Sequence, residues 1–197
     1  MKRLPLTNPE DIPDAAAAVG ETAAAGGVVL IPTETFYGLA ADPASEAAVE
    51  KVCAMKARPR GVPLPILCAD WTQVERLVEV PERHRVRLSR SWPGPLTVVA
   101  PARRPTAAGL EGTLAVRIPG HRLLRALLYI VGPLTGTSAN RHGAPPCTEA
   151  DRSLSQLDPA PDLVLDGGLT PGGIASTLVD ITGPSPKVLR AGAAPWS

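Results

Sequence analysis

Three basic side chains, Lys56, Arg58 and Arg60, stand within five residues of one another, and the stretch that follows them carries no acidic residue before Asp70. Arg binds phosphate oxygens through paired N–H donors, and Lys adds a compact positive charge. Such fixed charges stabilise the negative charge that develops during phosphoryl or nucleotidyl transfer. The segment therefore favours a polyphosphate site, with a solvated basic loop as the alternative interpretation.

A single arginine, Arg117, interrupts the apolar run Leu-Ala-Val-Arg-Ile at residues 114–118. A short apolar run of this kind is typical of a buried strand. A buried guanidinium needs an anionic partner, because an unpaired buried charge is strongly destabilising. That partner is either a carboxylate of the protein or a carboxylate of a ligand, and the sequence leaves both possibilities open.

Small polar side chains gather in Pro-Thr-Glu-Thr-Phe-Tyr-Gly-Leu at residues 32–39 and in Thr-Gly-Thr-Ser-Ala-Asn at residues 135–140, and Ser176 and Arg190 follow later. Ligands of open α/β sheets bind where strands end. Glycines also let a ligand approach backbone N–H groups closely. A ligand site and a set of ordinary turns, with hydroxyls bonded to the backbone, are both open at this point.

Other common kinds of site are disfavoured by their patterns. The chain contains no Gly-x-Gly and no Gly-Lys, so the dinucleotide-binding fingerprint and the P-loop are absent. Three cysteines and three histidines stand far apart, which fits reduced thiols and disfavours a zinc site or a disulfide framework. Ser138 lacks the second glycine of a Gly-x-Ser-x-Gly nucleophile elbow.

Length and composition limit the fold that can position these residues. The 197 residues suffice for one domain, and a content of 44% hydrophobic and 20% charged residues is typical of globular proteins. The 18 Gly and 23 Pro indicate many short elements joined by tight turns. A net charge of +1 favours no class of partner. No charge-free stretch approaches the roughly 20 apolar residues of a membrane span and no signal peptide is evident, so we expect a cytoplasmic protein without membrane contact.

Strands and helices are predicted to alternate along much of the chain. Short β-branched runs predict strands near residues 27–32, 65–68, 96–99, 114–118, 163–165, 177–181 and 187–189. Apolar periodicity and helix-start signals predict helices near residues 9–25, 44–57, 72–80, 81–92, 121–131 and 148–157. These elements predict an α/β fold with one mixed, partly antiparallel sheet and flanking helices, and residues 1–197 as a single domain.

Seven motifs occur in order between about residues 10 and 192. They are Pro-Thr-Glu-Thr-Phe-Tyr-Gly-Leu (32–39), Lys-Ala-Arg-Pro running into Pro-Leu (56–64), Trp-Pro-Gly-Pro-Leu-Thr (92–97), Val-Arg-Ile-Pro (116–119), Ser-Ala-Asn (138–140), Ser-Thr-Leu-Val-Asp (176–180) and Leu-Arg-Ala-Gly (189–192). In order and spacing the chain resembles the YrdC-like family, the threonylcarbamoyl-AMP synthases that begin synthesis of N6-threonylcarbamoyladenosine in tRNA.

The resemblance implies a fold and a reaction. The fold is a twisted α/β sheet with a large concave face. The substrates are ATP, L-threonine and bicarbonate, with Mg²⁺ on the triphosphate. A carbamate formed from threonine and bicarbonate attacks the α-phosphorus and releases pyrophosphate. No side-chain nucleophile is required, because catalysis rests on positioning and charge stabilisation.

The resemblance also assigns roles to individual residues. It makes Lys56 and Arg58 the catalytic cations and implies no metal-ligating residue of the protein. The residues implied for L-threonine are Thr35, Tyr37, Arg117 and Ser176, with Arg117 as the partner of the carboxylate. The residues implied for ATP are Lys56, Arg58, Thr113, Ser138, Asn140 and Arg190.

The chain departs from the family pattern at several positions, among them two in the segment 62–68, and other functions stay open. Val62 stands where many members have Lys or Asn, and Leu67 or Cys68 stands where many have His. Some relatives have a second C-terminal domain, and the end of this chain at Ser197 indicates the short, single-domain form. One alternative function is a non-catalytic RNA-binding module, and another is a YrdC-like domain that uses a carbamoyl phosphate-type donor. Contact with RNA or with the proteins that transfer the threonylcarbamoyl group to tRNA is also open.

Overall fold

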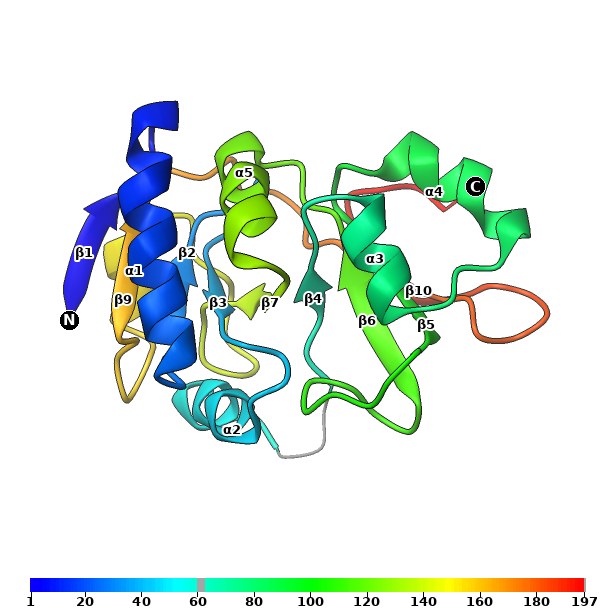
Figure 1. Ribbon diagram of the computed structural model, residues 1–197, viewed down its shortest axis with the longest axis horizontal. Helices are drawn as coiled ribbons and strands as arrows, with labels where there is room; N and C mark the ends of the chain where they lie inside the picture. Colours follow the sequence, from blue (N-terminus) through cyan, green and yellow to red (C-terminus); the bar gives the residue numbers. More distant parts are fainter. Residues whose placement is uncertain (60–62, 197) are drawn as a thin grey trace.

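The chain folds into two β-sheets with helices packed against them, as the computed structural model in Figure 1 shows. The structure describes residues 1–59 and 63–196. A large buried cluster includes Leu30 and Leu39 from the first sheet and Val98 and Val116 from the second, so the two sheets share a core. This shared core fixes the edges of the sheets relative to each other.

The first sheet has the strand order β1-β9-β2-β3-β8. Strands β1, β9 and β2 pair in parallel, whereas β3 is antiparallel to both β2 and β8. Strand β2 is buried on both faces, which explains why its sequence is an unbroken apolar run. The strand bounds are β1 (Lys2–Pro5), β2 (Val29–Ile31), β3 (Gly38–Ala40), β8 (Thr137–Ser138) and β9 (Leu163–Asp166).

Two helices, α1 (Ile12–Ala24) and α5 (Arg122–Val131), cover one face of the first sheet (Figure 1). Val19 and Leu127 from these helices are buried in one cluster with strand residues of the sheet. Helix α1 has Pro in its first turn and ends before Gly26, whose φ of +69° suits a residue without a Cβ. The alanine-rich sequence of α1 therefore packs closely on the sheet.

The second sheet has the strand order β11-β10-β5-β6-β4-β7. Strand β10 is parallel to β5, and β5 is antiparallel to β6. The strand bounds are β4 (Ile66–Leu67), β5 (Leu96–Pro101), β6 (Thr113–Arg117), β7 (Leu134–Thr135), β10 (Thr177–Asp180) and β11 (Lys187–Arg190). The remaining helices are α2 (Glu46–Met55), α3 (Trp71–Leu77), α4 (Glu82–Ser91), α6 (Ala150–Leu154) and the 3-10 turn η1 (Pro9–Asp11).

The predicted α/β class with mixed strand pairing is confirmed. All seven predicted strands are present, although the strands divide into two sheets instead of one. Strands β1, β3, β7 and β8 were not predicted, because they are two to four residues long and each of them contains Gly, Pro or hydroxyl side chains. Their extended form depends on pairing with distant strands, which local propensity does not report.

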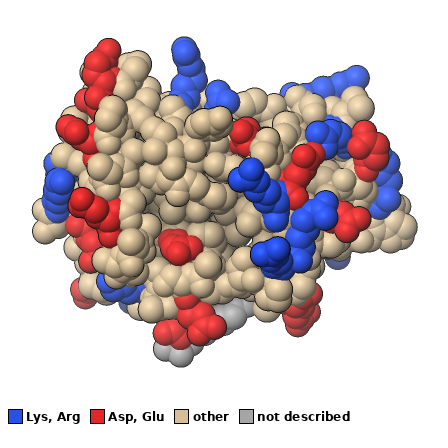
Figure 2. Space-filling view, viewed as in Figure 1, with Lys and Arg blue, Asp and Glu red and all other residues tan. Residues whose placement is uncertain are grey.

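Charge is distributed unevenly between the two halves of the molecule. One half comprises residues 56–118 and 176–197 and contains β4, β5, β6, β10 and β11. This half has 13 Lys and Arg residues and 6 Asp and Glu residues. The rest of the chain has 7 Lys and Arg residues and 13 Asp and Glu residues. In Figure 2 most of the basic side chains lie on the right, over α3 and α4. A net charge near zero therefore conceals a basic half and an acidic half. Among the residues described, no helix is both long and apolar enough to cross a membrane.

Candidate functional site

A cleft of about 480 Å³ lies between the two sheets. Its floor is one face of the second sheet, formed by Thr97 and Val99 of β5, Ala115 and Arg117 of β6 and Leu178 of β10. Side chains alternate between the faces of a strand, so the residues between these are buried in the core. The alternation of side chains therefore places the guanidinium of Arg117 and the hydroxyl of Thr97 on a floor that is otherwise apolar.

The opposite wall includes the loop between β2 and β3. The Thr33 hydroxyl holds this loop, because its Oγ1 accepts from the backbone N–H groups of Thr35 at 3.1 Å and Phe36 at 3.2 Å and donates to the Phe36 carbonyl at 2.7 Å. The hydroxyl of Thr35 lies 3.1 Å from that of Thr33, and both residues line the cleft. The loop thus presents hydroxyls to the cleft in a fixed position.

The cleft brings together side chains from distant motifs. Most of the residues that the family resemblance implies for the site line this cleft, namely Thr35, Tyr37, Lys56, Arg58, Arg117, Ser138, Asn140, Ser176 and Arg190. Arg60 and Val62, from the same basic segment as Lys56, lie outside the described residues.

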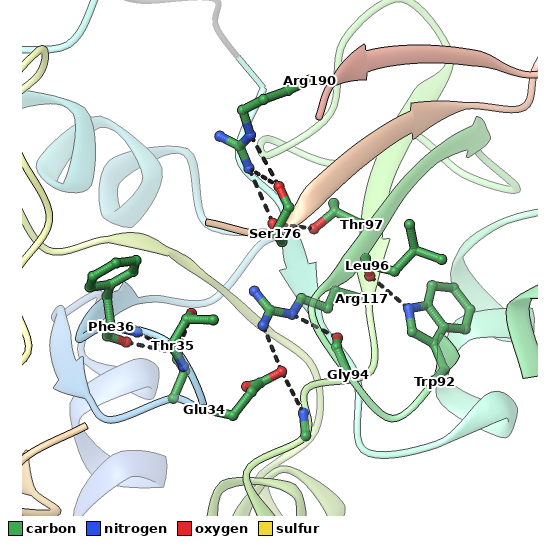
Figure 3. Close-up of polar contacts among 12 residues, drawn as sticks. Glu34, Thr35, Phe36, Trp92, Gly94, Leu96, Thr97, Arg117, Ser176 and Arg190 are labelled. Carbon is green, nitrogen blue, oxygen red and sulfur yellow. Dashed lines mark hydrogen bonds and ion pairs between the residues drawn. The ribbon is translucent and has the colours of Figure 1, made fainter. Parts of the chain in front are cut away.

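Arg117 is paired with a carboxylate of the protein, Glu34. Its Nη2 donates to Glu34 Oε1 at 2.6 Å and its Nε donates to the Gly94 carbonyl at 3.1 Å, and the two charged side chains are only 9% and 19% exposed. Glu34 Oε1 also accepts from the Gly120 N–H at 2.7 Å. Figure 3 shows the remaining Nη1 on the side away from Gly94. Glu34 was not assigned a role from the sequence, although an acid between two threonines that follows a buried strand is a usable signal.

Arg190, at the end of β11, lies over Ser176. Its Nε and Nη2 donate to the Ser176 carbonyl at 3.1 and 2.8 Å, and Nη2 also lies 3.1 Å from Ser176 Oγ (Figure 3). Ser176, the residue that directly precedes β10, therefore orients a guanidinium at the edge of the cleft.

Lys56 and Arg58 enter the cleft directly after helix α2. Lys56 Nζ donates to the carbonyls of Ser138 and, at 2.7 Å, of Asn140. Arg58 Nη1 lies 3.4 Å from Thr137 Oγ1 and its Nη2 donates to the Pro63 carbonyl at 3.0 Å, while its buried Nε has no partner among the described residues. Both cations thus lie against the 137–140 segment with donors still available.

Asn140 offers an acceptor at the same end of the cleft. Its Nδ2 donates to the carbonyls of Arg141 at 2.9 Å and Ala144 at 2.6 Å, which fixes the orientation of the amide. Its Oδ1 is buried and has no partner among the described residues. A hydrogen-bond donor of a ligand would satisfy this oxygen.

Burial and mutual repulsion lower the pKa of three of these cations. Burial, followed by the charge of Arg58, lowers the pKa of Lys56 to about 8. Burial lowers the pKa of Arg58, and the positive charge of Arg190 lowers it further. Burial also lowers the pKa of Arg190, and the positive charge of Arg117 lowers that pKa further. A cationic group destabilised in this way is stabilised by an anionic ligand, so the cleft favours a polyanion.

Tyr37 lines the cleft, but its hydroxyl is used inside the protein. The hydroxyl lies 2.7 Å from the Gly168 carbonyl, to which it donates, and accepts from the Gly167 N–H at 3.0 Å. Burial raises the pKa of Tyr37 to about 12. The side chain therefore ties the β2–β3 loop to the end of β9.

The structure does not bring Thr113 to the cleft. Thr113 begins β6, four residues before Arg117, and its hydroxyl donates to the Leu110 carbonyl at 2.7 Å beside a separate small hollow. Leu67 and Cys68 do not line the cleft either, because both side chains are buried in the core. A Cβ on Gly136 would lie 2.3 Å from Leu67 Cγ, so Leu67 packs beneath the cleft wall.

The described residues contain no group of three or more His, Cys, Asp or Glu side chains placed to hold a metal ion.

We expect the affinity for MgATP to fall as the pH rises through about 8. The pKa of Lys56 lies near that value, so Lys56 loses its positive charge above it and the phosphates lose one cationic partner. Titration calorimetry between pH 7 and pH 9.5 should show a weakening of about 10-fold. Lys56→Arg is the control, because Arg keeps its charge over this range. The same decline in that variant would show that Lys56 is not the titrating group.

We expect Gly192→Ala to lower the free energy of unfolding by about 2–3 kcal/mol. A Cβ at Gly192 would lie 2.3 Å from the Ala175 carbonyl oxygen and 2.4 Å from the Thr177 nitrogen, and backbone atoms cannot rotate away. Gly20 in α1 has nothing within 4 Å of an added Cβ. Gly20→Ala is therefore the matched control and should stabilise the protein by about 0.5–1 kcal/mol. Denaturant unfolding checks both, and equal effects would contradict the close backbone contact.

Comparison with known proteins gives consistent matches. A family model named Sua5, YciO and YrdC and described as telomere recombination matches residues 21–192. The chain is 38% identical over 161 residues to the threonylcarbamoyl-AMP synthase of Serratia proteamaculans, which covers 77% of this chain and 85% of that protein. It is 39% identical over 194 residues to the threonylcarbamoyl-AMP synthase of Bacillus subtilis, which covers 94% of this chain and 54% of that protein.

Solved structures are similar in fold as well. The crystal structure of Pyrococcus abyssi Sua5 complexed with L-threonine superposes with a TM-score of 0.85 at 35% identity and covers 97% of this chain and 57% of that one. The present chain therefore spans about half the length of the B. subtilis and P. abyssi proteins.

Proposed function

Because this chain belongs to the Sua5/YciO/YrdC family, we propose that it is a threonylcarbamoyl-AMP synthase, a nucleotidyltransferase that acts on L-threonine, bicarbonate and ATP. The family resemblance inferred from the seven motifs is confirmed. The observation that carries the proposed activity is the convergence of Lys56, Arg58, Arg117 and Arg190 in one cleft. Relatives named threonylcarbamoyl-AMP synthase match over most of this chain, which supports the same activity here.

In this proposal Arg117 binds the carboxylate of L-threonine. Glu34 and the Gly94 carbonyl already hold Nη2 and Nε, so the guanidinium is oriented before the ligand arrives. Preorganised donors of this kind need no reorganisation during the reaction. The hydroxyls of Thr35 and Ser176 line the same cleft and bind the remainder of the amino acid.

The triphosphate of ATP binds Lys56, Arg58 and Arg190, with Ser138 and Asn140 beside it. Mg²⁺ arrives with the phosphates as part of the substrate and neutralises charge on them. The Nε of Arg58 and the Oδ1 of Asn140 are buried without a partner in the part of the chain that the structure describes, and they provide a donor and an acceptor at this end of the cleft.

The reaction then follows from positioning. The threonine amine adds to bicarbonate with loss of water and forms a carbamate. A carbamate oxygen attacks the α-phosphorus, the bond from that phosphorus to the bridging oxygen breaks, and pyrophosphate leaves. Lys56 and Arg58 stabilise the charge that develops on the phosphates, and holding both reactants in one cleft lowers the entropic barrier.

We place this activity in the cytoplasm, at the start of threonylcarbamoyladenosine formation in tRNA. The product is a mixed anhydride that a second protein must transfer to RNA, so the transfer proteins are the expected partners. Direct RNA binding is the alternative function, and the basic half of the chain is the observation that favours it.

Pyrophosphate release from MgATP and bicarbonate, with and without L-threonine, tests the proposal. Serine and carbamoyl phosphate are the controls, and mass spectrometry identifies the adenylate. We expect threonine-dependent pyrophosphate and the mass of threonylcarbamoyl-AMP. Turnover with carbamoyl phosphate alone would replace threonine as the substrate, and salt-dependent RNA binding without any adenylate would replace the enzyme with an RNA-binding module.

A further inference from the structure

Thr97 lies on the floor of the cleft beside Arg117 and has no role in the proposal above. The residue is 2% exposed and lines the cleft. Val98 pairs with Val116 in the antiparallel ladder of β5 and β6, which places Thr97 opposite Arg117 on the same face. Opposite residues of this kind have Cβ atoms about 5 Å apart. A ligand whose carboxylate rests on Arg117 therefore has its next groups over Thr97.

The Thr97 hydroxyl belongs to a short hydrogen-bonded chain. Thr97 Oγ1 lies 3.1 Å from Ser176 Oγ, and Arg190 Nη2 donates to Ser176 Oγ at 3.1 Å (Figure 3). Arg has donors only, so Ser176 Oγ is the acceptor in that contact. The two hydroxyls carry one hydrogen each, and one of these closes the bond between them. One O–H of the pair is left to donate into the cleft.

The surroundings of this donor are apolar. Thr97 pairs with Leu178 of β10 on the side away from Arg117, and Val99 and Ala115 form the next pair on the same face of the ladder. All three line the cleft. The floor thus combines a cation for a carboxylate, one hydroxyl donor and an apolar surface that fits a methyl group.

We propose that Thr97 is a specificity-determining residue that recognises the side-chain hydroxyl of L-threonine, with Arg190 and Ser176 orienting the donor. The inference rests on the proposed function. Threonine has oxygen atoms only in its carboxylate and its hydroxyl, and Arg117 binds the carboxylate. The remaining O–H of the Thr97–Ser176 pair donates to the hydroxyl oxygen, and the methyl group lies over Leu178, Val99 and Ala115.

The test compares two substrates with three forms of the full chain. L-valine has a methyl group in place of the threonine hydroxyl, so it removes the ligand's half of the contact. Thr97→Val removes the protein's half with little change of volume, and Thr97→Ser is the matched control that keeps the hydroxyl. We expect Thr97→Val to raise the KM for L-threonine about 10-fold in pyrophosphate release. The same variant should change kcat and the KM for ATP by less than about 2-fold. It should also change the rate of pyrophosphate release with L-valine, which we expect to be low in the wild-type chain, by less than about 2-fold. The Thr97→Ser variant should retain the preference for threonine over valine.

Each other outcome overturns the inference in a recognisable way. Equal weakening of threonine and valine by Thr97→Val would make the role of Thr97 structural. No change in either would show that another group recognises the hydroxyl. If calorimetry detects no binding of L-threonine to the wild-type chain, the proposed function fails and the inference fails with it. Binding to the wild-type chain together with an unaltered Thr97→Val variant would contradict the inference alone.

Discussion

The Arg117→Ala variant should lose at least about 100-fold in kcat/KM for L-threonine, the scale of removing one preorganised charge contact. Two effects act in the same direction. The carboxylate of the substrate loses its cationic partner, and Glu34 becomes a largely buried carboxylate without its 2.6 Å ion pair. The KM for L-threonine should account for most of the loss, because the proposed function places Arg117 on the carboxylate of the substrate and not on the reacting phosphate.

A second variant separates lost binding from lost structure. Glu34→Gln combined with Arg117→Ala removes the unpaired carboxylate, so this double variant should recover thermal stability relative to Arg117→Ala alone. It should not recover activity. Pyrophosphate release and thermal unfolding measured on the same preparations check both statements. Turnover of Arg117→Ala near the wild-type rate would remove Arg117 from the threonine site.

Arg58→Ala should lower kcat at least about 100-fold, again the scale of one preorganised charge contact on a reacting group. Arg58 lies in the cleft, where its Nη2 donates to the Pro63 carbonyl and its buried Nε has no partner among the described residues, so the guanidinium is held in place with a donor still available. In the proposed reaction the charge of Arg58 stabilises the departing pyrophosphate, and the effect should therefore fall mainly on kcat.

Two control variants define the interpretation of the Arg58 result. Arg104→Ala removes an exposed arginine of the same basic half and should leave activity within about 2-fold. Arg58→Lys keeps a charge without the planar fork and should recover part of the rate. Single-turnover measurements with saturating substrates isolate the chemical step. Equal losses for Arg58→Ala and Arg104→Ala would point to the overall field of the protein rather than to a contact in the site.

Much of the site could be anticipated from the sequence, because its cations interrupt patterns that are otherwise simple. Arg117 breaks an apolar strand run, and Lys56 and Arg58 follow directly on a helix pattern. Each anomaly is local and therefore visible in a single sequence. These three cations line the same cleft because Lys56 and Arg58 directly follow the end of α2 and Arg117 is the last residue of β6.

Other features depend on contacts between distant parts of the chain. The division into two sheets is governed by strands as short as the two residues of β7 and β8, which have little local signature. The Tyr37 hydroxyl is bound at residues 167–168 near the end of β9, so a motif tyrosine serves the scaffold. Glu34 could not be matched to Arg117 from spacing alone, since 82 residues separate them along the chain.

The unequal sharing of charge between the two halves makes the molecule an electric dipole. All four cations of the cleft belong to the positive half, whose 13 basic residues outnumber its 6 acidic ones. An approaching polyphosphate is attracted to this half and repelled by the other before any contact forms, so diffusional encounters are oriented toward the cleft. Screening shortens the reach of this field to about 10 Å at 0.1 M salt. The association rate for ATP should therefore decline with ionic strength more steeply than the dissociation rate changes.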